Sequence, residues 1–109
     1  MTKEELERLP KKIRIAVAAG VEAANAQPDD GGSANLDRVV IPMRRVREST
    51  IAKHGLPGYL SEASRWHGRA LHLDAPFKGQ GNRRYAGVQA MHKSLQAQGV
   101  NCYVYYQID

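Results

Sequence analysis

The sequence predicts a small α/β protein, a two-layer sandwich whose three-stranded sheet alternates with helices in the order α-β-α-β-α-β. Apolar residues recur at helical spacing near the N-terminus and over residues 85–98. Two short β-branched or apolar runs lie at residues 36–43 and 69–75, and residues 100–109 alternate strongly as a strand does. Neighbouring strands that are parallel would need right-handed crossovers, and an α+β arrangement is the alternative.

Length and composition set the outer limits. A chain of 109 residues is one compact domain with a modest core, and 42% hydrophobic with 25% charged content is typical of globular proteins. Its single cysteine, Cys102, excludes an intramolecular disulfide and a thiolate zinc cluster. The polar N-terminus is unlike a signal peptide, and no run of about 18 apolar residues exists. We therefore expect a cytoplasmic protein with no membrane partner.

Residues 1–27 form the predicted N-terminal helix. Thr2 and Glu5 have the spacing of a capping box. One apolar face follows, made of Leu6, Leu9, Ile13, Val17, Gly20, Val21 and Ala24. Pro10 interrupts it, and a proline inside a helix costs about 3 kcal/mol. We expect a kink near Pro10, a main helix over residues 11–26, and packing of this helix against the rest.

The remaining elements belong to an α/β core at residues 36–109, joined to the first helix by a Gly- and Pro-containing linker at 28–35. After the strand at 36–43, residues 44–54 predict a short helix that ends at Gly55. Residues 60–67 are ambiguous between a loop and a helical turn. The helix over 85–98 is expected to stop at Gly99, and all segments to form one domain.

Charge is unevenly distributed. Residues 1–30 hold five Lys/Arg and six Asp/Glu, a sum of −1, whereas residues 31–109 hold eleven and five, a sum of +6. The formal net charge is +5. Such a bias favours an anionic partner: nucleic acid, an acidic protein or a phosphorylated ligand. The plain alternative is that the charge serves solubility.

The turn before the helix at 85–98 is the first candidate site. It consists of Lys78, Gly79, Gln80, Gly81, Asn82, Arg83 and Arg84. Glycines let the backbone approach a ligand, Asn82 is a good capping residue, and cations at a helix N-terminus are unfavourable by about 0.3–1 kcal/mol each. Something negative should therefore face the arginines, either a phosphate or the carboxylate of Asp74 or of the C-terminus. A plainly solvated turn is the other alternative. The spacing matches no Walker or dinucleotide-binding motif.

A second cluster, Arg44, Arg45 and Arg47, opens the predicted helix at 44–54. Ligands of open α/β sheets gather beyond the carboxyl ends of parallel strands. If the strands are parallel, this cluster and Arg83 with Arg84 form one basic rim. If they are antiparallel, the two clusters lie at opposite ends. A solvated arginine cluster with no ligand is the plain alternative.

Tyr103 and Tyr105 point to the same side of the last predicted strand. On an uncovered sheet face beside Arg38 or His72, they would form a platform on which bases stack. RRM domains use aromatic residues in this way, although neither RNP consensus is present here. The ordinary alternative, which we expect, is that the N-terminal helix covers this face.

No catalytic or metal-binding motif is recognisable, so we expect no catalytic residues, metal or cofactor. His72 and Asp74 share one side of a strand and are the sole candidates for acid–base chemistry on a phosphorylated small molecule. Cys102 lies on the apolar side of its strand and is expected to be a core residue.

Together these patterns predict a small non-enzymatic binding module whose arginine-rich edge engages a phosphate-rich partner, with nucleic acid as the expected one. The alternative is a protein-interaction module, such as an accessory or inhibitor protein or a homodimer. It would act through the edge of the C-terminal strand or through the N-terminal helix.

Overall fold

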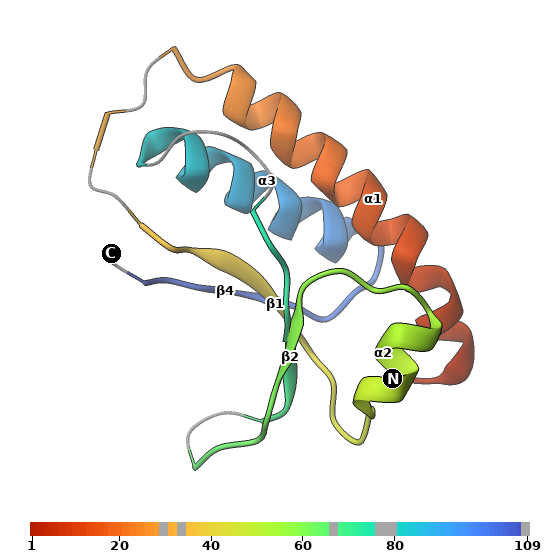
Figure 1. The fold of residues 1–109 in the computed structure, drawn as a ribbon. Helices are drawn as coiled ribbons and strands as arrows, with labels where there is room; N and C mark the ends of the chain where they lie inside the picture. The colour runs from red at the N-terminus through yellow and green to blue at the C-terminus, as the bar shows by residue number, and fades with distance from the viewer. Residues whose placement is uncertain (29–30, 33–34, 66–67, 76–80, 108–109) are drawn as a thin grey trace.

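The computed structural model of the protein describes residues 1–28, 31–32, 35–65, 68–75 and 81–107. Within these residues the chain forms three helices and four strands in a mixed α/β fold (Figure 1). The helices are α1 (Lys3–Asn25), α2 (Glu48–Lys53) and α3 (Asn82–Ala97). The strands are β1 (Arg38–Pro42), β2 (Tyr59–Ser61), β3 (Ala70–His72) and β4 (Tyr103–Tyr105).

The sheet has one strand more than predicted, and the strand direction that the sequence left open is antiparallel. Its strands follow the order β2-β3-β1-β4, and each neighbouring pair is antiparallel. The additional strand is β2, which pairs with β3 so that Tyr59 lies opposite His72. A strand of three residues is too short to show an alternating pattern, and residues 60–67 were therefore ambiguous. The element order is α-β-α-β-β-α-β, an α+β arrangement in place of alternating crossovers.

α1 begins as its sequence predicts. The Glu5 amide donates to Thr2 Oγ1 at 3.1 Å, and the Thr2 amide donates to Glu5 Oε1 at 2.9 Å, which completes the capping box. The helix continues through Pro10 without ending there. Its proline forfeits one backbone hydrogen bond, while Leu6 and Leu9 on the preceding turn are buried in the core and hold that turn in place.

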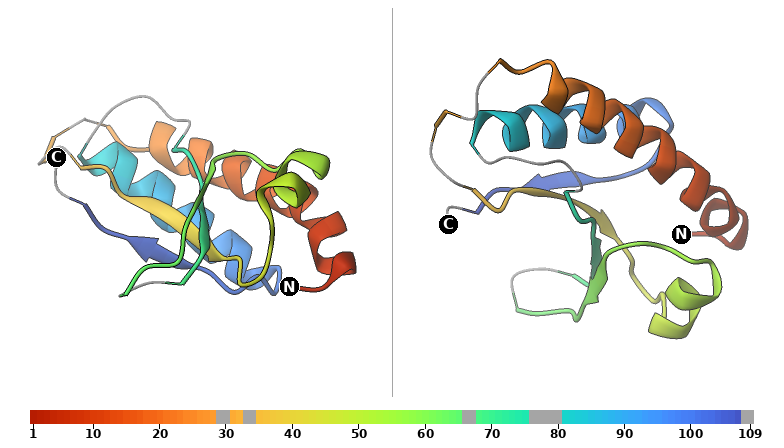
Figure 2. Two further views of the ribbon diagram at one scale, coloured as in Figure 1. Left: turned by 60° about the horizontal axis from the view of Figure 1, so that its bottom comes forward. Right: turned by 45° about the horizontal axis from the view of Figure 1, so that its top comes forward.

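The core lies between the sheet and the paired helices α1 and α3, which run side by side over one face (Figures 1 and 2). Alternate residues of the strands point into it: Val39, Ile41 and Leu71, with Leu73 just beyond β3. Buried residues of α3 are Gly87, Val88, Met91 and Leu95, and those of α1 include Ala16, Gly20 and Ala24. Burying each large aliphatic side chain contributes about 1.5–3 kcal/mol, so this layer carries the hydrophobic stability.

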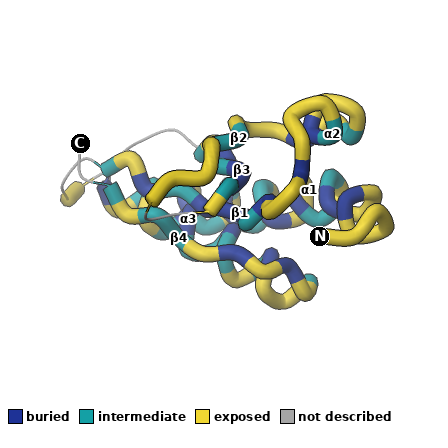
Figure 3. Tube along the Cα trace, turned by 90° about the horizontal axis from the view of Figure 1, so that it is seen from below, coloured by how far each residue is buried: buried dark blue, intermediate teal, exposed yellow. Residues whose placement is uncertain are grey.

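No helix formed by the described residues covers the opposite face of the sheet. Arg38 lies opposite Tyr105 and Val40 lies opposite Tyr103, so these four side chains point away from α1 and α3. Figure 3 views the molecule from this side, with the strands in front of the two helices. The expectation that the N-terminal helix covers the tyrosines is therefore wrong. The helices cover the face of Val39 and Ile41 instead, because that face is entirely aliphatic.

We predict that Gly58, at the entry to β2, is essential for the pairing of β2 with β3. Its φ is +85°, and a Cβ atom there would lie 2.0 Å from the main-chain oxygen of His72. Gly58→Ala should lower the free energy of unfolding by about 3 kcal/mol or more, since left-handed strain and a backbone clash combine. Chemical denaturation measures this loss.

Gly55→Ala is the matched control. Gly55 also has a positive φ, +63°, but a Cβ atom there would meet nothing within 4 Å. Its substitution should cost only about 1 kcal/mol, from backbone strain alone. Equal losses for the two variants would show that the close approach to His72 has no energetic weight.

Candidate functional site

The outward side of the sheet, called the open face below, is the main candidate. The strand registers place these side chains on it: Arg38, Val40, Tyr59, Ser61, Ala70, His72, Tyr103 and Tyr105. Val40 and Ala70 form its apolar floor and are buried by their neighbours. Around them stand four rings and one guanidinium, drawn from all four strands.

Arg38 is the centre of the open face. Its Nε donates to His72 Nδ1 at 2.9 Å, and its Nη1 donates to the Leu36 carbonyl at 3.0 Å and to Gln107 Oε1 at 2.8 Å. The guanidinium carbon also lies 4.6 Å from the centroid of the Tyr105 ring, a cation–π distance. Arg38 therefore ties β1 to β3, to β4 and to the chain beyond β4.

These contacts decide the tautomer of His72. Arginine can only donate, so Nδ1 accepts and the imidazole is neutral with its proton on Nε2. Nε2 lies 3.0 Å from Ser61 Oγ, which in turn donates to the Ala70 carbonyl at 3.2 Å. A continuous hydrogen-bond chain thus runs from Arg38 through His72 to β2, and it holds the imidazole in one orientation.

The rings of Tyr59 and His72 stand upright on the open face, with their planes roughly perpendicular to the plane of the sheet. Tyr59 and His72 are stacked with centroids 4.7 Å apart and planes 7° from parallel. That distance is the spacing between neighbouring strands, about 4.7–4.9 Å, so the two rings stand side by side across β2 and β3. Tyr105 meets His72 edge-on at 6.3 Å. Because β2 is an edge strand and Tyr59 is 51% exposed, the outer side of its ring is open to a further ring.

Two hollows adjoin Arg38. The first, of about 270 Å³, lies on the open face and is lined by Arg38, Ser61, Glu62, Ser64, Gly68, Ala70, His72, Tyr103 and Tyr105. The second, called the end hollow below, is about 550 Å³ and lies where β1 and β2 begin. Its lining residues are Leu36, Arg38, Tyr59, Leu73, Asp74, Ala75, Arg84 and Gln107.

The predicted turn before α3 is described in part. Lys78, Gly79 and Gln80 lie outside the described residues. Gly81, with φ +61°, precedes the first helical residue, so the expectation that Asn82 caps the helix is wrong. The Asn82 amide instead donates to the Gly31 carbonyl at 2.8 Å, and Asn35 Nδ2 donates to the Gly81 carbonyl at 3.2 Å. These bonds fix the start of α3 against the linker.

The two arginines of this turn differ in their surroundings. Arg83 and Arg84 are both half-buried in the first turn of α3. Arg84 Nε donates to the Asp37 carbonyl at 3.0 Å, and the side chain lines the end hollow together with Arg38. The structure thus places Arg84 beside an arginine that sequence reasoning had linked only to the tyrosines.

Asp74 was one of two carboxylates named as possible partners of these arginines within the protein, the other being the C-terminal one. It lines the end hollow, yet it forms no ion pair or hydrogen bond with any described residue. In the described part of the chain, the ion pair observed is Arg69 Nη1 with Glu62 Oε2, at 2.6 Å. The C-terminal carboxylate lies outside the described residues.

Arg44, Arg45 and Arg47 lie at the opposite end of the sheet from Arg84. β1 runs antiparallel to β3, so the end of β1 is remote from the point where the chain leaves β3 for α3. The single basic rim is therefore not formed. Arg44 and Arg45 precede the helix, whereas Arg47 is the N-cap residue of α2, which begins at Glu48.

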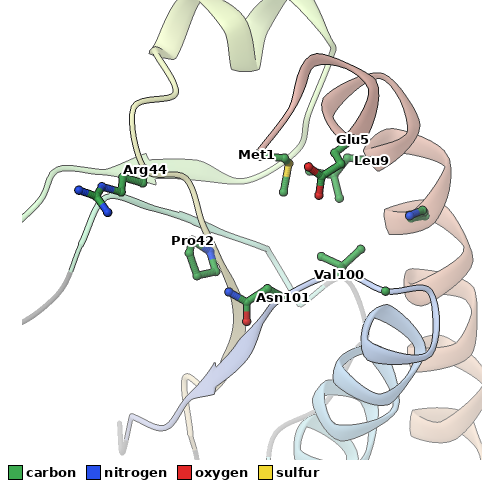
Figure 4. Close-up of a pocket in the computed structure, with 9 residues that line it drawn as sticks. Met1, Glu5, Leu9, Pro42, Arg44, Val100 and Asn101 are labelled. Carbon is green, nitrogen blue, oxygen red and sulfur yellow. The ribbon is translucent and has the colours of Figure 1, made fainter.

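Arg44 and Arg45 occupy a tight turn before α2. The Val46 amide donates to the Met43 carbonyl at 3.0 Å, and Arg45 has φ +64°. A pocket of about 310 Å³ nearby is lined by Met1, Glu5, Leu9, Lys12, Pro42, Arg44, Gly99, Val100 and Asn101. In Figure 4 the Arg44 side chain extends away from Glu5 and Leu9, so its guanidinium does not face the apolar floor of this pocket.

The candidates for acid–base and nucleophilic chemistry are not brought together. His72 is bonded to Arg38 and Ser61, and Asp74 is not among its hydrogen-bond partners. His92 Nε2 faces the Cys102 carbonyl at 3.3 Å, so it donates there and is no base for the thiol. Across the described residues, no group of three His, Cys, Asp or Glu side chains could hold a metal ion.

No family model, curated protein or solved structure matches the chain. No helix in the described segments is both long and apolar enough to cross a membrane. What the open face can do follows from its chemistry: upright rings suit stacking with planar groups, and guanidinium groups suit phosphate or carboxylate.

Sequence reasoning missed Tyr59 and the position of Arg38. Both are ordinary residues in the sequence, and only the antiparallel pairing of β2 with β3 and of β3 with β1 gathers them around His72. The local signal that the sequence offered was Gly58 after Pro57, because a Pro-Gly pair marks a turn from which a strand can begin.

We predict that the thiol of Cys102 reacts only slowly with alkylating reagents in the folded protein. Burial raises the pKa of the Cys102 thiol to about 11, so at pH 8 very little thiolate is present. Alkylation by iodoacetamide at pH 8 should be roughly a hundredfold slower in the native protein than in denaturant, where the pKa returns to about 8.5. Mass spectrometry over time measures both rates.

The same shift gives stability a definite pH dependence. The folded state holds the Cys102 proton more tightly than the unfolded state. The contribution of the protonated thiol to the free energy of unfolding is therefore complete below the unfolded pKa, and it is lost as pH rises toward about 11. Cys102→Ala should remove that alkaline loss. Equal alkylation rates in native and denatured protein would contradict the burial of the thiol.

Proposed function

We propose that the protein is a small non-enzymatic module that binds single-stranded nucleic acid across the open face. The observation that supports this is the group of three aromatic side chains, Tyr59, His72 and Tyr105, which lie on the open face with the guanidinium of Arg38. Stacking of a base on an aromatic side chain contributes about 1–3 kcal/mol per base and tolerates any sequence. An aromatic sheet face joined to arginines is suited to this kind of ligand.

The upright rings favour a single strand over a duplex. In a duplex both faces of each base are covered by its neighbours, so no base can stack on a protein ring without being unpaired. The outer side of Tyr59 extends the Tyr59–His72 stack beyond the sheet edge. An unpaired base can continue this stack at little cost, because the protein rings are already aligned.

The guanidinium groups beside the rings suit the phosphates of the same strand. Within the described residues, Arg84 makes a single hydrogen bond through Nε, and Arg38 makes its bonds through Nε and Nη1. The remaining terminal nitrogens are donors that a phosphate can accept from. The sum of +6 over residues 31–109 adds a longer-range attraction for a polyanion.

We expect binding that weakens with salt and depends on Arg84. In fluorescence anisotropy with a labelled oligonucleotide, the logarithm of the association constant should fall linearly with the logarithm of salt concentration, by about 0.7 per phosphate contact. Arg84→Gln should reduce the slope by about that amount. Arg14→Gln is the matched control, because Arg14 is exposed on α1 away from the open face. Absence of binding at low salt would exclude the proposal.

Tyr59→Ala tests the stacking itself. It should weaken binding of a single strand by roughly tenfold, equivalent to about 1.4 kcal/mol of lost stacking. Tyr85→Ala is its control, since Tyr85 is 53% exposed, close to the 51% of Tyr59, but belongs to α3. Equal losses for the two variants would show that the open face is not the binding surface.

A protein partner is the second candidate, and it is favoured by the exposed edge of β4. In the described sheet β4 pairs with β1 alone, so its outer edge presents backbone groups to which another chain can add a strand. Tyr103 and Tyr106 beside this edge are 37% and 61% exposed. Light scattering tests the homodimeric form: twice the 12.1 kDa mass of the chain supports it, and a monomer across a wide concentration range excludes it.

A further inference from the structure

We infer that the end hollow recognises a ribonucleotide, so that the single-stranded ligand is RNA in preference to DNA. This inference rests on the proposed function and concerns which nucleic acid the module selects. It is carried by one residue that a simple phosphate-binding surface would not contain, the carboxylate of Asp74.

Four of the side chains that line the end hollow bring three kinds of chemistry: one phenol ring, two guanidinium groups and one carboxylate. Tyr59 comes from the start of β2, Arg38 from the start of β1, and Arg84 from the first turn of α3. Asp74 comes from the chain just after β3. The hollow therefore offers a ring for a base, two guanidinium groups for phosphate, and one carboxylate. When it is ionised, that carboxylate accepts hydrogen bonds and donates none.

The ionised carboxylate is unfavourable for a ligand that brings phosphate alone. Asp74 is exposed and forms no ion pair with Arg38 or Arg84, so its charge is not cancelled by a direct contact with either arginine. It repels a phosphodiester that approaches the two guanidinium groups. A ligand gains from Asp74 only if it carries an O–H or N–H donor next to its phosphate.

The ribose 2′-hydroxyl is a donor that meets this requirement in every ribonucleotide and in no deoxyribonucleotide. On the nucleotide, this hydroxyl lies on the sugar, between the base and the 3′ phosphate. In the protein, Asp74 lines the same hollow as the ring of Tyr59, which suits the base, and the guanidinium of Arg84, which suits the phosphate. Carboxylates accept hydrogen bonds from ribose hydroxyls in dinucleotide-binding folds for the same chemical reason. The 2′-hydroxyl is also the group by which proteins distinguish RNA from DNA.

The arginines cannot make this distinction. A guanidinium only donates, and the phosphates of RNA and DNA are the same acceptors. Tyr59 stacks on the bases of either nucleic acid. Three side chains of the end hollow carry a charge, and only that of Asp74 interacts differently with the two nucleic acids. It repels the phosphates of DNA, whereas it accepts a hydrogen bond from the 2′-hydroxyl of RNA.

The test compares two probes that differ only in the 2′ position, labelled oligouridylate and labelled oligodeoxyuridylate of equal length. By fluorescence anisotropy at low salt, the wild-type protein should bind the ribo-oligomer about tenfold more tightly, as expected for one hydrogen bond to a charged group. A 2′-O-methyl oligomer, which lacks the donor, should bind like the deoxy-oligomer.

Asp74→Ala is the decisive variant. It should weaken binding of the ribo-oligomer and strengthen binding of the deoxy-oligomer, so that the two affinities converge. Because Asp74 is exposed and has no hydrogen bond to a described residue, the variant should fold, which circular dichroism verifies. Glu22→Ala is the matched control: it removes an exposed carboxylate from α1, and it should change both affinities alike.

The outcomes separate this inference from the proposed function. Equal affinity of the wild-type protein for both oligomers, or an equal gain for both in Asp74→Ala, would overturn the preference for RNA and leave single-strand binding intact. Failure of both oligomers to bind at low salt would remove the proposed function and this inference together. Opposite changes for the two oligomers in Asp74→Ala, absent in Glu22→Ala, support the inference.

Discussion

The structure depends on the need to bury one aliphatic face of the sheet. Val39, Ile41 and Leu71 point to the same side, and no polar group interrupts them. α1 and α3 cover that side, and the small residues Gly20 and Gly87 are buried on the two helices. Once both long helices are used in this way, none remains for the other side of the sheet. The open face is therefore a consequence of how the core is satisfied.

The open face is kept ordered by Arg38. In place of a second hydrophobic layer, one guanidinium joins His72 on β3, Tyr105 on β4 and Gln107 beyond it. Each hydrogen bond of this kind contributes modestly to stability, about 0.5–1.5 kcal/mol net and more when charged. Their larger effect is geometric, because they hold the rings upright and leave donor nitrogens of Arg38 at the margin. A surface that is rigid before the ligand arrives loses less entropy on binding.

The candidate site could be predicted in part. Arg84 and Tyr105 were recognisable from their local settings, a helix N-terminus and an alternating strand. Tyr59 was not, because its strand is too short to show a period. Arg44 and its neighbours were recognised as cations, but their distance from Arg84 depends on strand direction, which the sequence does not show. The antiparallel pairing places the two groups of arginines at opposite ends of the sheet. Asp74 was one possible partner of the arginines, and the structure leaves it without an ion pair to any described residue.

By itself the sequence determined what is local: the capping box of α1, the apolar faces of the long helices, the alternating sides of the last strand, and the uneven charge. Hydrogen-bond caps and side-chain periodicity act over a few residues, so their signals are readable along the chain. Only the tertiary structure decided strand order and direction, and with them the meeting of Arg38, Tyr59 and Arg84. Backbone hydrogen bonds between strands are the same whichever strands pair, so pairing is settled by the packing of the whole core.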